Sequence, residues 1–311
     1  MTQQSRVVKA NGIDIAITEQ GTGPLLLLCH GWPELSYSWR HQIPVLAAAG
    51  YRVVAPDMRG YGGTSAPADI NAYSILDLVG DMVALVKALG ETQAIIIGHD
   101  WGANVAWHCA LFRPDVFPAV AALSVPFAKR ASMRPLAKLR RNGIANFYWH
   151  YFQTPGVVEA EFAKDWNFAI RAVMYGRGVS LIQKPETGFL DHAVVPDAPP
   201  AWISEAELAH YVETFKRTGL AGGFNWYRNI DRNWDLSAPW QGAKIPVPAV
   251  FIAGAKDGTI QGEMGAARLR EMETIVPHMR EVLIIDKAGH WIQQERPKEV
   301  NEALLRFLSG L

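Results

Sequence analysis

One stretch of this chain, Ala94-Ile-Ile-Ile-Gly98-His99-Asp100-Trp101-Gly102-Ala103, joins an apolar run to a predicted helix through a glycine-flanked turn. Residues 95–97 are β-branched and uninterrupted, as in a central parallel strand that is covered on both faces. Residues 101–112 continue as a helix that Arg113-Pro114 ends. The stretch therefore predicts a strand, a sharp turn and a helix, with Asp100 in the turn.

The turn matches the Gly-x-Ser-x-Gly nucleophile elbow, except that Asp100 stands where the serine would be. Gly98 and Gly102 would leave room for the strained turn and for close packing of the helix. A serine that displaced a leaving group from a saturated carbon would end as an ether, which water does not readily cleave. A carboxylate would end as an ester with an attackable carbonyl. Asp100 therefore suits substitution at an sp3 carbon, and a helix-capping aspartate is the alternative interpretation.

Composition limits the classes of partner and the compartment. The 311 residues are 49% hydrophobic, which is enough for a large core. A formal charge of +0, from 30 basic and 30 acidic residues, argues against nucleic-acid and membrane-surface partners. No signal region and no apolar run of membrane-spanning length is present, so we expect a soluble cytoplasmic protein. Cys29 and Cys109 are expected to be reduced core residues without a metal or redox role.

Strands and helices alternate in the first and last parts of the sequence. The pair Asn11-Gly12 predicts a type I′ hairpin between residues 7–10 and 13–18. Further strands are predicted at residues 25–29, 52–55, 94–97, 119–124, 249–253 and 281–285. Helices are predicted at residues 74–89, 101–112, 263–274 and 298–308. Such alternation predicts an α/β fold with a mostly parallel central sheet flanked by helices.

The middle of the chain has a different pattern. From residue 126 to residue 245 we expect helices without strands, and the clearest helix begins at a capping box of Ser204 and Glu207 and ends at Gly219. We therefore predict that residues 1–125 and 246–311 form one core domain and that residues 126–245 form an inserted helical cap, or lid.

A nucleophile elbow requires an acid and a histidine further along the chain. Asp257 follows the strand predicted at residues 249–253, and His290 follows the strand predicted at residues 281–285. Both would lie on loops at the carboxyl ends of strands. A turn aspartate before Gly258 and a packed loop histidine are the alternatives. We predict Asp100 as the nucleophile, His290 as the general base and Asp257 as the acid that orients it.

Six motifs follow one another along the chain: His30-Gly-Trp-Pro33, Asp57-Met-Arg-Gly-Tyr-Gly62, Gly98-His-Asp-Trp-Gly102, Tyr148-Trp-His-Tyr-Phe-Gln153, Asn225-Trp-Tyr-Arg-Asn229 and Gly289-His-Trp291. In this order they resemble the motifs of the soluble epoxide hydrolases of the α/β-hydrolase fold, over nearly the whole chain. The resemblance implies that Tyr148 and Tyr227 hang from the cap over Asp100 and donate hydrogen bonds to the epoxide oxygen. Aromatic packing within the cap is the alternative.

The resemblance also implies a reaction. Asp100 would attack a ring carbon to give a hydroxyalkyl ester, and His290 would then activate the water that hydrolyses it to a vicinal diol. A phenol with an ordinary pKa of about 10 stays protonated at neutral pH and can donate to the developing alkoxide. This chemistry needs no cofactor and no metal.

Further site residues come from the loops beside the elbow and from the cap. The backbone N–H groups of Trp32 and Trp101 are expected to form the oxyanion hole of ester hydrolysis. The resemblance implies a cis bond between Trp32 and Pro33. Glu34 is predicted to position water near His290, with a surface-loop residue as the alternative. An apolar, partly aromatic substrate pocket is expected from Trp149, Phe152 and Trp226.

Several rival functions share part of this pattern. A haloalkane dehalogenase would share Asp100 and the halide-binding indole of Trp101 but would lack the tyrosine pair. A haloacetate dehalogenase, such as one acting on fluoroacetate, usually has Arg in place of Trp101, and Asp100 disfavours an ordinary esterase. The complete triad argues against a receptor without turnover. We expect an epoxide and water as the small-molecule partners, and a monomer or homodimer.

Overall fold

The strands form a single mixed sheet. The computed structural model describes residues 3–182, 184 and 186–311, so Met1 and Thr2 of the predicted core, and Gln183 and Pro185 of the predicted cap, lie outside the described residues. The sheet order is β1-β2-β4-β3-β5-β6-β7-β8, in which β1–β2 and β2–β4 are antiparallel and the other pairs are parallel. The strands are β1 (Gln4–Ala10), β2 (Ile13–Gln20), β3 (Leu25–Cys29), β4 (Arg52–Pro56), β5 (Ile95–His99), β6 (Val120–Leu123), β7 (Ala249–Gly254) and β8 (Met279–Ile285). The prediction of a mostly parallel α/β sheet is confirmed.

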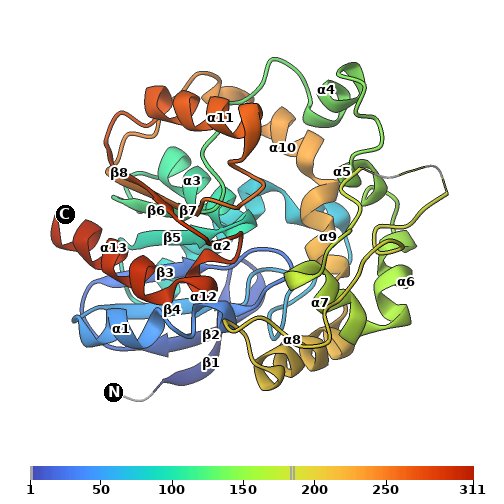
Figure 1. The fold of residues 1–311 in the computed structure, drawn as a ribbon. Coiled ribbons are helices and arrows are strands. Elements are labelled where there is room, and N and C mark those ends of the chain that lie inside the picture. The colour runs from blue at the N-terminus through green and yellow to red at the C-terminus, as the bar shows by residue number, and fades with distance from the viewer. Residues whose placement is uncertain (1–2, 183, 185) are drawn as a thin grey trace.

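Helices cover both faces of this sheet (Figure 1). Helices α1 (Ile43–Ala48), α12 (Ile292–Glu295) and α13 (Pro297–Ser309) share an apolar cluster with one face. The other face packs against α2 (Ile75–Ala88), α3 (Trp101–Phe112) and α11 (Gly262–Ile275). Short 3-10 helices occur at Ser36–Trp39, Ile70–Tyr73 and Ala238–Trp240. Every residue of β3, β6 and β7 is buried, which explains their uninterrupted apolar runs.

Local sequence signals account for most element boundaries. Asn11 and Gly12 have φ angles of 49° and 76°, as a type I′ hairpin turn requires, and join β1 to β2. The predicted strand at residues 94–97 differs from the structure, because β5 continues through Gly98 to His99. Gly98 remains in the sheet since it pairs with Cys29 on β3 and Ala122 on β6.

The segment between β6 and β7 is helical. Over its described residues it contains no named strand, and its β-pairing is limited to isolated bridges. Helix α8 begins at the predicted Ser204–Glu207 capping box and ends at Gly219. The division into core and cap domains remains a prediction. The helices are α4 (Pro135–Arg141), α5 (Tyr148–Tyr151), α6 (Val157–Lys164), α7 (Trp166–Tyr175), α8 (Glu205–Thr218), α9 (Ala221–Arg228) and α10 (Ile230–Leu236).

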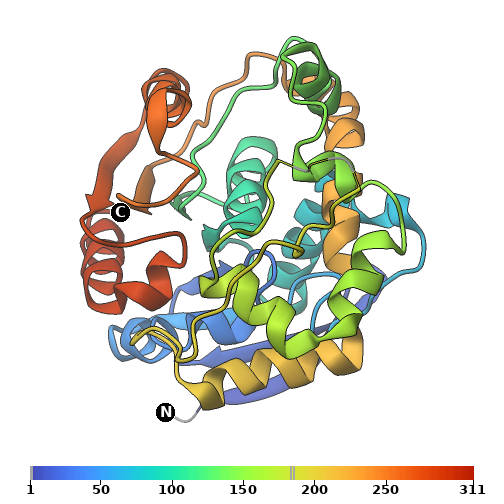
Figure 2. The same cartoon turned by 45° about the vertical axis from the view of Figure 1, so that its right-hand side comes forward.

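These helices gather on one side of the molecule (Figure 1), and Figure 2 shows α8 next to β1, with which it lines a common pocket. Helix α9 lies directly on the loop after β4. A Cβ added to Gly60 would approach the Gly222 backbone to 2.8 Å, and the indole N–H of Trp226 donates to the Arg59 carbonyl at 3.0 Å. This close contact fixes the position of Tyr227, the next residue on α9.

None of the helices formed by the described residues is both long enough and apolar enough to cross a membrane.

Candidate active site

Asp100 occupies a strained turn between β5 and α3. Its φ and ψ angles are 52° and −119°, a combination that a residue with a side chain rarely adopts. Gly98 and Gly102 permit this turn, because without side chains they let neighbouring backbone segments come into close contact. A Cβ on Gly98 would lie 2.1 Å from the Gly102 carbonyl oxygen, and a Cβ on Gly102 would lie 2.1 Å from the Cys29 carbonyl oxygen. The turn therefore holds the Asp100 carboxylate at the carboxyl edge of the sheet.

The structure brings the three predicted triad residues together. The Nε2 atom of His290 lies 3.4 Å from Oδ2 of Asp100, and its Nδ1 atom lies 2.9 Å from Oδ2 of Asp257. The loops after β5, β7 and β8 supply these groups. The other oxygen of Asp257 accepts hydrogen bonds from the backbone N–H and hydroxyl of Thr259. Asp257 is thus fixed on both oxygens and orients the imidazole toward Asp100.

The charges of these groups stabilise one another. Burial disfavours the ionised form of both aspartates, but His290 outweighs this effect, so the pKa of Asp100 lies below its ordinary value and the pKa of Asp257 falls to about 2. Burial also opposes protonation of His290. The adjacent Asp257 and Asp100 carboxylates overcome that cost and hold the pKa of His290 well above its ordinary value. The free site therefore favours an imidazolium between two carboxylates.

A backbone donor faces the Asp100 carboxylate from the loop after β3. The Trp32 N–H donates to Oδ1 of Asp100 at 2.8 Å, and the Trp32–Pro33 bond is cis, as the resemblance implied. A Cβ on Gly31 would lie 2.4 Å from Cβ of Asp100, so glycine is needed at this position for the approach. Trp101 is the first residue of α3, and its predicted role as the second donor remains a prediction.

Tyr148 on α5 and Tyr227 on α9 lie beside each other and beside the turn at Asp100. The ring centroids of Tyr148 and Tyr227 are 5.8 Å apart, and the Tyr227 ring lies 5.2 Å from that of Trp101. Burial and the Asp100 charge raise the pKa of the Tyr148 phenol. The pKa of Tyr227 is raised mainly by burial, and further by its electrostatic interactions with Tyr148 and Asp100. Both phenols therefore keep their protons beside an anionic Asp100 and remain hydrogen-bond donors.

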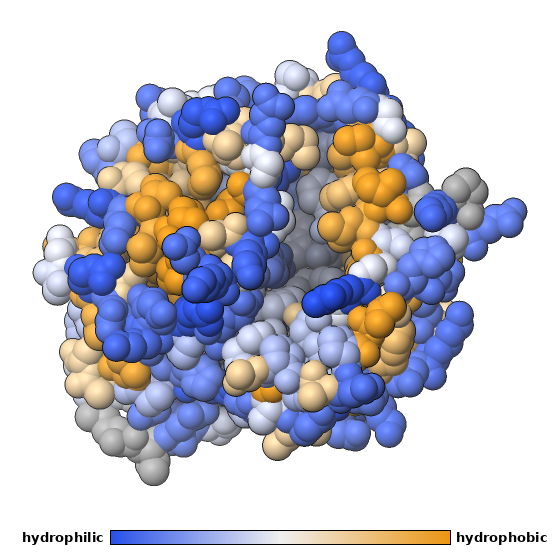
Figure 3. Space-filling view, viewed as in Figure 1, coloured by the Kyte–Doolittle hydropathy of each residue, from blue (hydrophilic) through white to orange (hydrophobic). Residues whose placement is uncertain are grey.

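The predicted aromatic lining lies near these tyrosines at different depths. Phe152 is fully buried and packs on Trp32, Tyr148 and Tyr227. Trp149 is half-buried next to Tyr148. Trp226 is buried behind Trp101, where its indole N–H donates to the Arg59 carbonyl in the loop after β4. The space-filling view is hollowed near its centre, with apolar surface along its right-hand rim (Figure 3).

Glu34 is not a surface-loop residue. It is fully buried, and hydrogen bonds to both of its oxygens compensate for the loss of water. Oε2 lies 3.1 Å from the Gly31 backbone nitrogen and 2.7 Å from Nδ1 of His99. The side chains of Gln293 and Gln294 donate to Oε1. Burial opposes its ionisation, but His99 outweighs this and lowers the pKa of Glu34. The Nε2 atom of His99 lies 2.7 Å from the His290 carbonyl oxygen. Glu34 is therefore connected to His290 through His99, and its role in positioning water remains a prediction.

Sequence reasoning missed the aromatic side chains that surround Trp32. The rings of Phe162, Phe189 and Phe224 lie 5.8 to 6.2 Å from that of Trp32. Phe189 also packs on Tyr148. These residues belong to no motif, and helical periodicity could have flagged only Phe162 and Phe224 as buried. Phe189 lies in an irregular segment, where the sequence carries no signal of burial.

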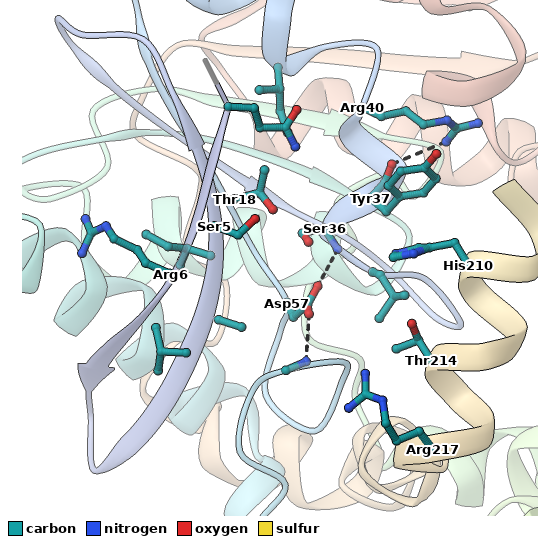
Figure 4. A pocket seen from close by; sticks show the side chains of 17 residues that line it. Ser5, Arg6, Thr18, Ser36, Tyr37, Arg40, Asp57, His210, Thr214 and Arg217 are labelled. Carbon is teal, nitrogen blue, oxygen red and sulfur yellow. Dashed lines mark hydrogen bonds between the residues drawn. The ribbon is translucent and has the colours of Figure 1, made fainter. Parts of the chain in front are cut away.

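A separate pocket of about 490 Å3 lies between β1, the turn at Ser36 and α8 (Figure 4). The Asp57 carboxylate in this pocket accepts hydrogen bonds from the backbone N–H groups of Ser36 and Gly63. His210 and Arg217 line the pocket from the side of α8. The catalytic candidates are not among its lining residues. Within the described ranges, no group of three or more His, Cys, Asp or Glu side chains could hold a metal ion.

Comparisons with known proteins agree with this geometry. Residues 24–164 match a family model described as the alpha/beta hydrolase fold. Epoxide hydrolase A of Mycobacterium tuberculosis is 47% identical over 98% of this chain and 97% of its own length, and an epoxide hydrolase of Caballeronia sordidicola is 40% identical over 97% and 92%. The crystal structure of epoxide hydrolase A from Mycobacterium thermoresistibile is similar with a TM-score of 0.94 and 46% identity, covering 100% of this chain and 99% of that one. The potato (Solanum tuberosum) epoxide hydrolase I structure has a TM-score of 0.93 and 39% identity, covering 100% of both chains.

The arrangement of charges predicts that the pKa of His290 depends on Asp100. Replacing Asp100 with Asn removes one of the two carboxylates that favour the imidazolium, so the pKa of His290 should fall and the neutral ring should appear at lower pH. NMR titration of the His290 ring measures this directly. Asp115→Asn, at an exposed carboxylate paired with Arg113, is the control and should leave the titration unchanged. An unaltered His290 pKa in Asp100→Asn would refute the assigned charge coupling.

Proposed function

We propose that this chain, which belongs to the epoxide hydrolase family of the α/β-hydrolase fold, opens its substrate by forming an ester on Asp100. The chain hydrolyses epoxides. The observation that most directly supports the covalent route is the position of the Asp100 carboxylate, which lies between the Trp32 N–H and the His290 imidazole. The mechanism below assigns each step to a group in this arrangement.

Ring opening begins with Oδ2 of Asp100, the oxygen that the Trp32 N–H does not hold. The Trp32 N–H holds Oδ1, so Oδ1 becomes the ester carbonyl oxygen and Oδ2 is the atom that attacks the epoxide carbon. The C–O bond of the ring breaks as the new C–O bond forms, and negative charge moves to the epoxide oxygen. Tyr148 and Tyr227 donate hydrogen bonds to that oxygen, because their raised pKa values keep both phenols protonated.

Ester formation changes the state of His290. Asp100 loses its charge when it becomes an ester, so only Asp257 still favours the imidazolium and the pKa of His290 falls. The imidazolium releases one proton and the alkoxide takes up one proton. The step therefore ends with a neutral imidazole, which is the form that a general base requires.

Hydrolysis of the ester uses this base. His290 takes a proton from water, and the hydroxide attacks Cγ of Asp100. The resulting oxyanion on Oδ1 is stabilised by the N–H of Trp32 and, we propose, by the N–H of Trp101. Collapse breaks the Cγ–Oδ2 bond, and the proton of the hydroxyl that came from water passes to the leaving oxygen. The diol departs with Oδ2, which came from Asp100, and the water oxygen stays in the regenerated carboxylate.

We propose an apolar substrate and a cytoplasmic location. Phe152, Phe189 and Trp32 surround the tyrosines with apolar surface, which supports an epoxide with hydrocarbon or aryl substituents.

The cysteines Cys29 and Cys109 are buried free thiols, which supports a reducing compartment. The assembly state, a monomer or homodimer, remains a prediction.

The tyrosine pair distinguishes this function from that of a dehalogenase. Loss of one donor to a developing oxyanion typically costs about 3 kcal/mol, or roughly a hundredfold in rate. Tyr148→Phe and Tyr227→Phe should therefore each slow ring opening by this order, and the double variant should be essentially inactive. Single-turnover assays with trans-stilbene oxide, and 1-bromobutane as the dehalogenase control, measure both reactions. Diol formation at a near wild-type rate in the double variant would contradict the assigned role.

His290 should matter more for the second half-reaction than for the first. His290→Gln leaves Asp100 able to attack but removes the base for water, so the ester should accumulate. Mass spectrometry of the variant with substrate should show the protein mass increased by that of the epoxide. A variant that neither turns over nor forms the adduct would show that His290 has another role.

A further inference from the structure

A buried carboxylate in the cap has no place in the mechanism above. Glu161, on α6, is 8% exposed and accepts three hydrogen bonds. Its Oε1 atom accepts the Leu190 N–H at 2.6 Å, and its Oε2 atom accepts the Phe189 N–H and the Tyr151 hydroxyl, both at 3.0 Å. Two consecutive backbone donors and one side chain thus converge on a single carboxylate. Burying a carboxylate is costly, so this arrangement calls for a reason.

The backbone donors belong to an irregular segment that we call the strap, which comprises residues 177–182 and 186–194. Its two limbs are joined by reciprocal backbone bonds between Arg177 and Val194 and by the bond from the Ser180 N–H to the Phe189 carbonyl. Three apolar side chains of the strap face solvent: Leu181, Ile182 and Val194 are 55%, 49% and 67% exposed. Phe189 and Leu190 are buried, and the partly buried Val179 and Ala193 pack against the same core. Glu161 therefore anchors the strap at its buried point.

The strap also holds Tyr148. The Tyr148 N–H donates to the Leu181 carbonyl at 2.8 Å, and Phe147 forms a β-bridge with Ile182. On the inner side, the Phe189 ring lies 5.8 Å from the Tyr148 ring. One limb thus fixes the backbone of Tyr148 and the other limits the position of its ring. Both limbs depend on the same carboxylate.

We infer that Glu161 is a positioning residue for ring opening, because it holds the strap that places the Tyr148 phenol over Asp100. The inference rests on the proposed role of Tyr148. Glutamate is required because both of its oxygens accept backbone N–H groups. A glutamine would turn its NH2 group toward either the Phe189 N–H or the Leu190 N–H, so one buried donor would lose its partner.

Glu161→Gln should therefore affect one half-reaction selectively. Displacement of a catalytic group by a fraction of an ångström to one ångström slows ring opening by about tenfold to a hundredfold. Ester hydrolysis depends on His290 and Asp257, so its rate should remain that of the wild type. Rapid-quench mass spectrometry with trans-stilbene oxide separates the two rates. Gly188→Ala is a second variant, which keeps Glu161 itself. The Cβ of the new alanine would lie 2.4 Å from Oε1 of Glu161 and so displace the carboxylate.

A matched control and a double variant make the test specific. Tyr151→Phe removes one of the three bonds but leaves both backbone donors on Glu161, so both rates should remain close to those of the wild type. Glu161 acts by positioning the Tyr148 hydroxyl, which Tyr148→Phe lacks. Adding Glu161→Gln to Tyr148→Phe should therefore slow ring opening by a further factor of less than about two.

Three outcomes would overturn the inference: equal slowing of both half-reactions by Glu161→Gln and Gly188→Ala, a full additional loss in the Tyr148→Phe background, or no change in either variant. A normal ring-opening rate in Tyr148→Phe alone would instead contradict the proposed role of Tyr148.

Discussion

The site depends on one constraint, the strained backbone of Asp100 at a positive φ between two glycines. In this conformation the carboxylate projects from the end of β5 and reaches the Trp32 N–H on one side and His290 on the other. The close contacts of Gly31, Gly98 and Gly102 leave no space for a Cβ. The fully buried strands β3 and β6 hold the turn from both sides, so the rigidity of the sheet offsets the cost of the strain.

In the mechanism that we propose, electrostatics decides the order of the chemical steps. An imidazolium between two carboxylates stabilises Asp100 as an anion, which is the form that attacks carbon. The same imidazolium cannot accept a proton from water. In this proposal, neutralisation of Asp100 by ester formation removes the obstacle, so the nucleophile and the base are active in sequence. Helices α5 and α9 contribute neutral phenols to the site, since the raised pKa values of Tyr148 and Tyr227 keep them from becoming additional anions.

Sequence reasoning predicted the features that depend on local pattern. The hairpin at Asn11-Gly12, the α8 capping box and the strand–turn–helix at Asp100 all follow from short-range rules, and their bounds agree with the structure to within a few residues. The position of Glu34 could not be predicted in this way, because its burial depends on Gln293 and Gln294 from the far end of the chain. Phe189 and Glu161 were missed for the same reason. Their contacts join α6 to an irregular segment that has no periodicity, and only the folded chain brings them together.

The covalent ester on Asp100 is the central claim, and oxygen labelling tests it most directly. In a single turnover in H2(18)O with enzyme in excess, the attacking water should leave its oxygen in the regenerated carboxylate, while the diol carries the former Asp100 oxygen. Peptide mass spectrometry should therefore find the heavy isotope in the Asp100 side chain, with unlabelled diol in solution. Label in the diol and none in Asp100 would mean that water attacks the epoxide directly, and would contradict the account.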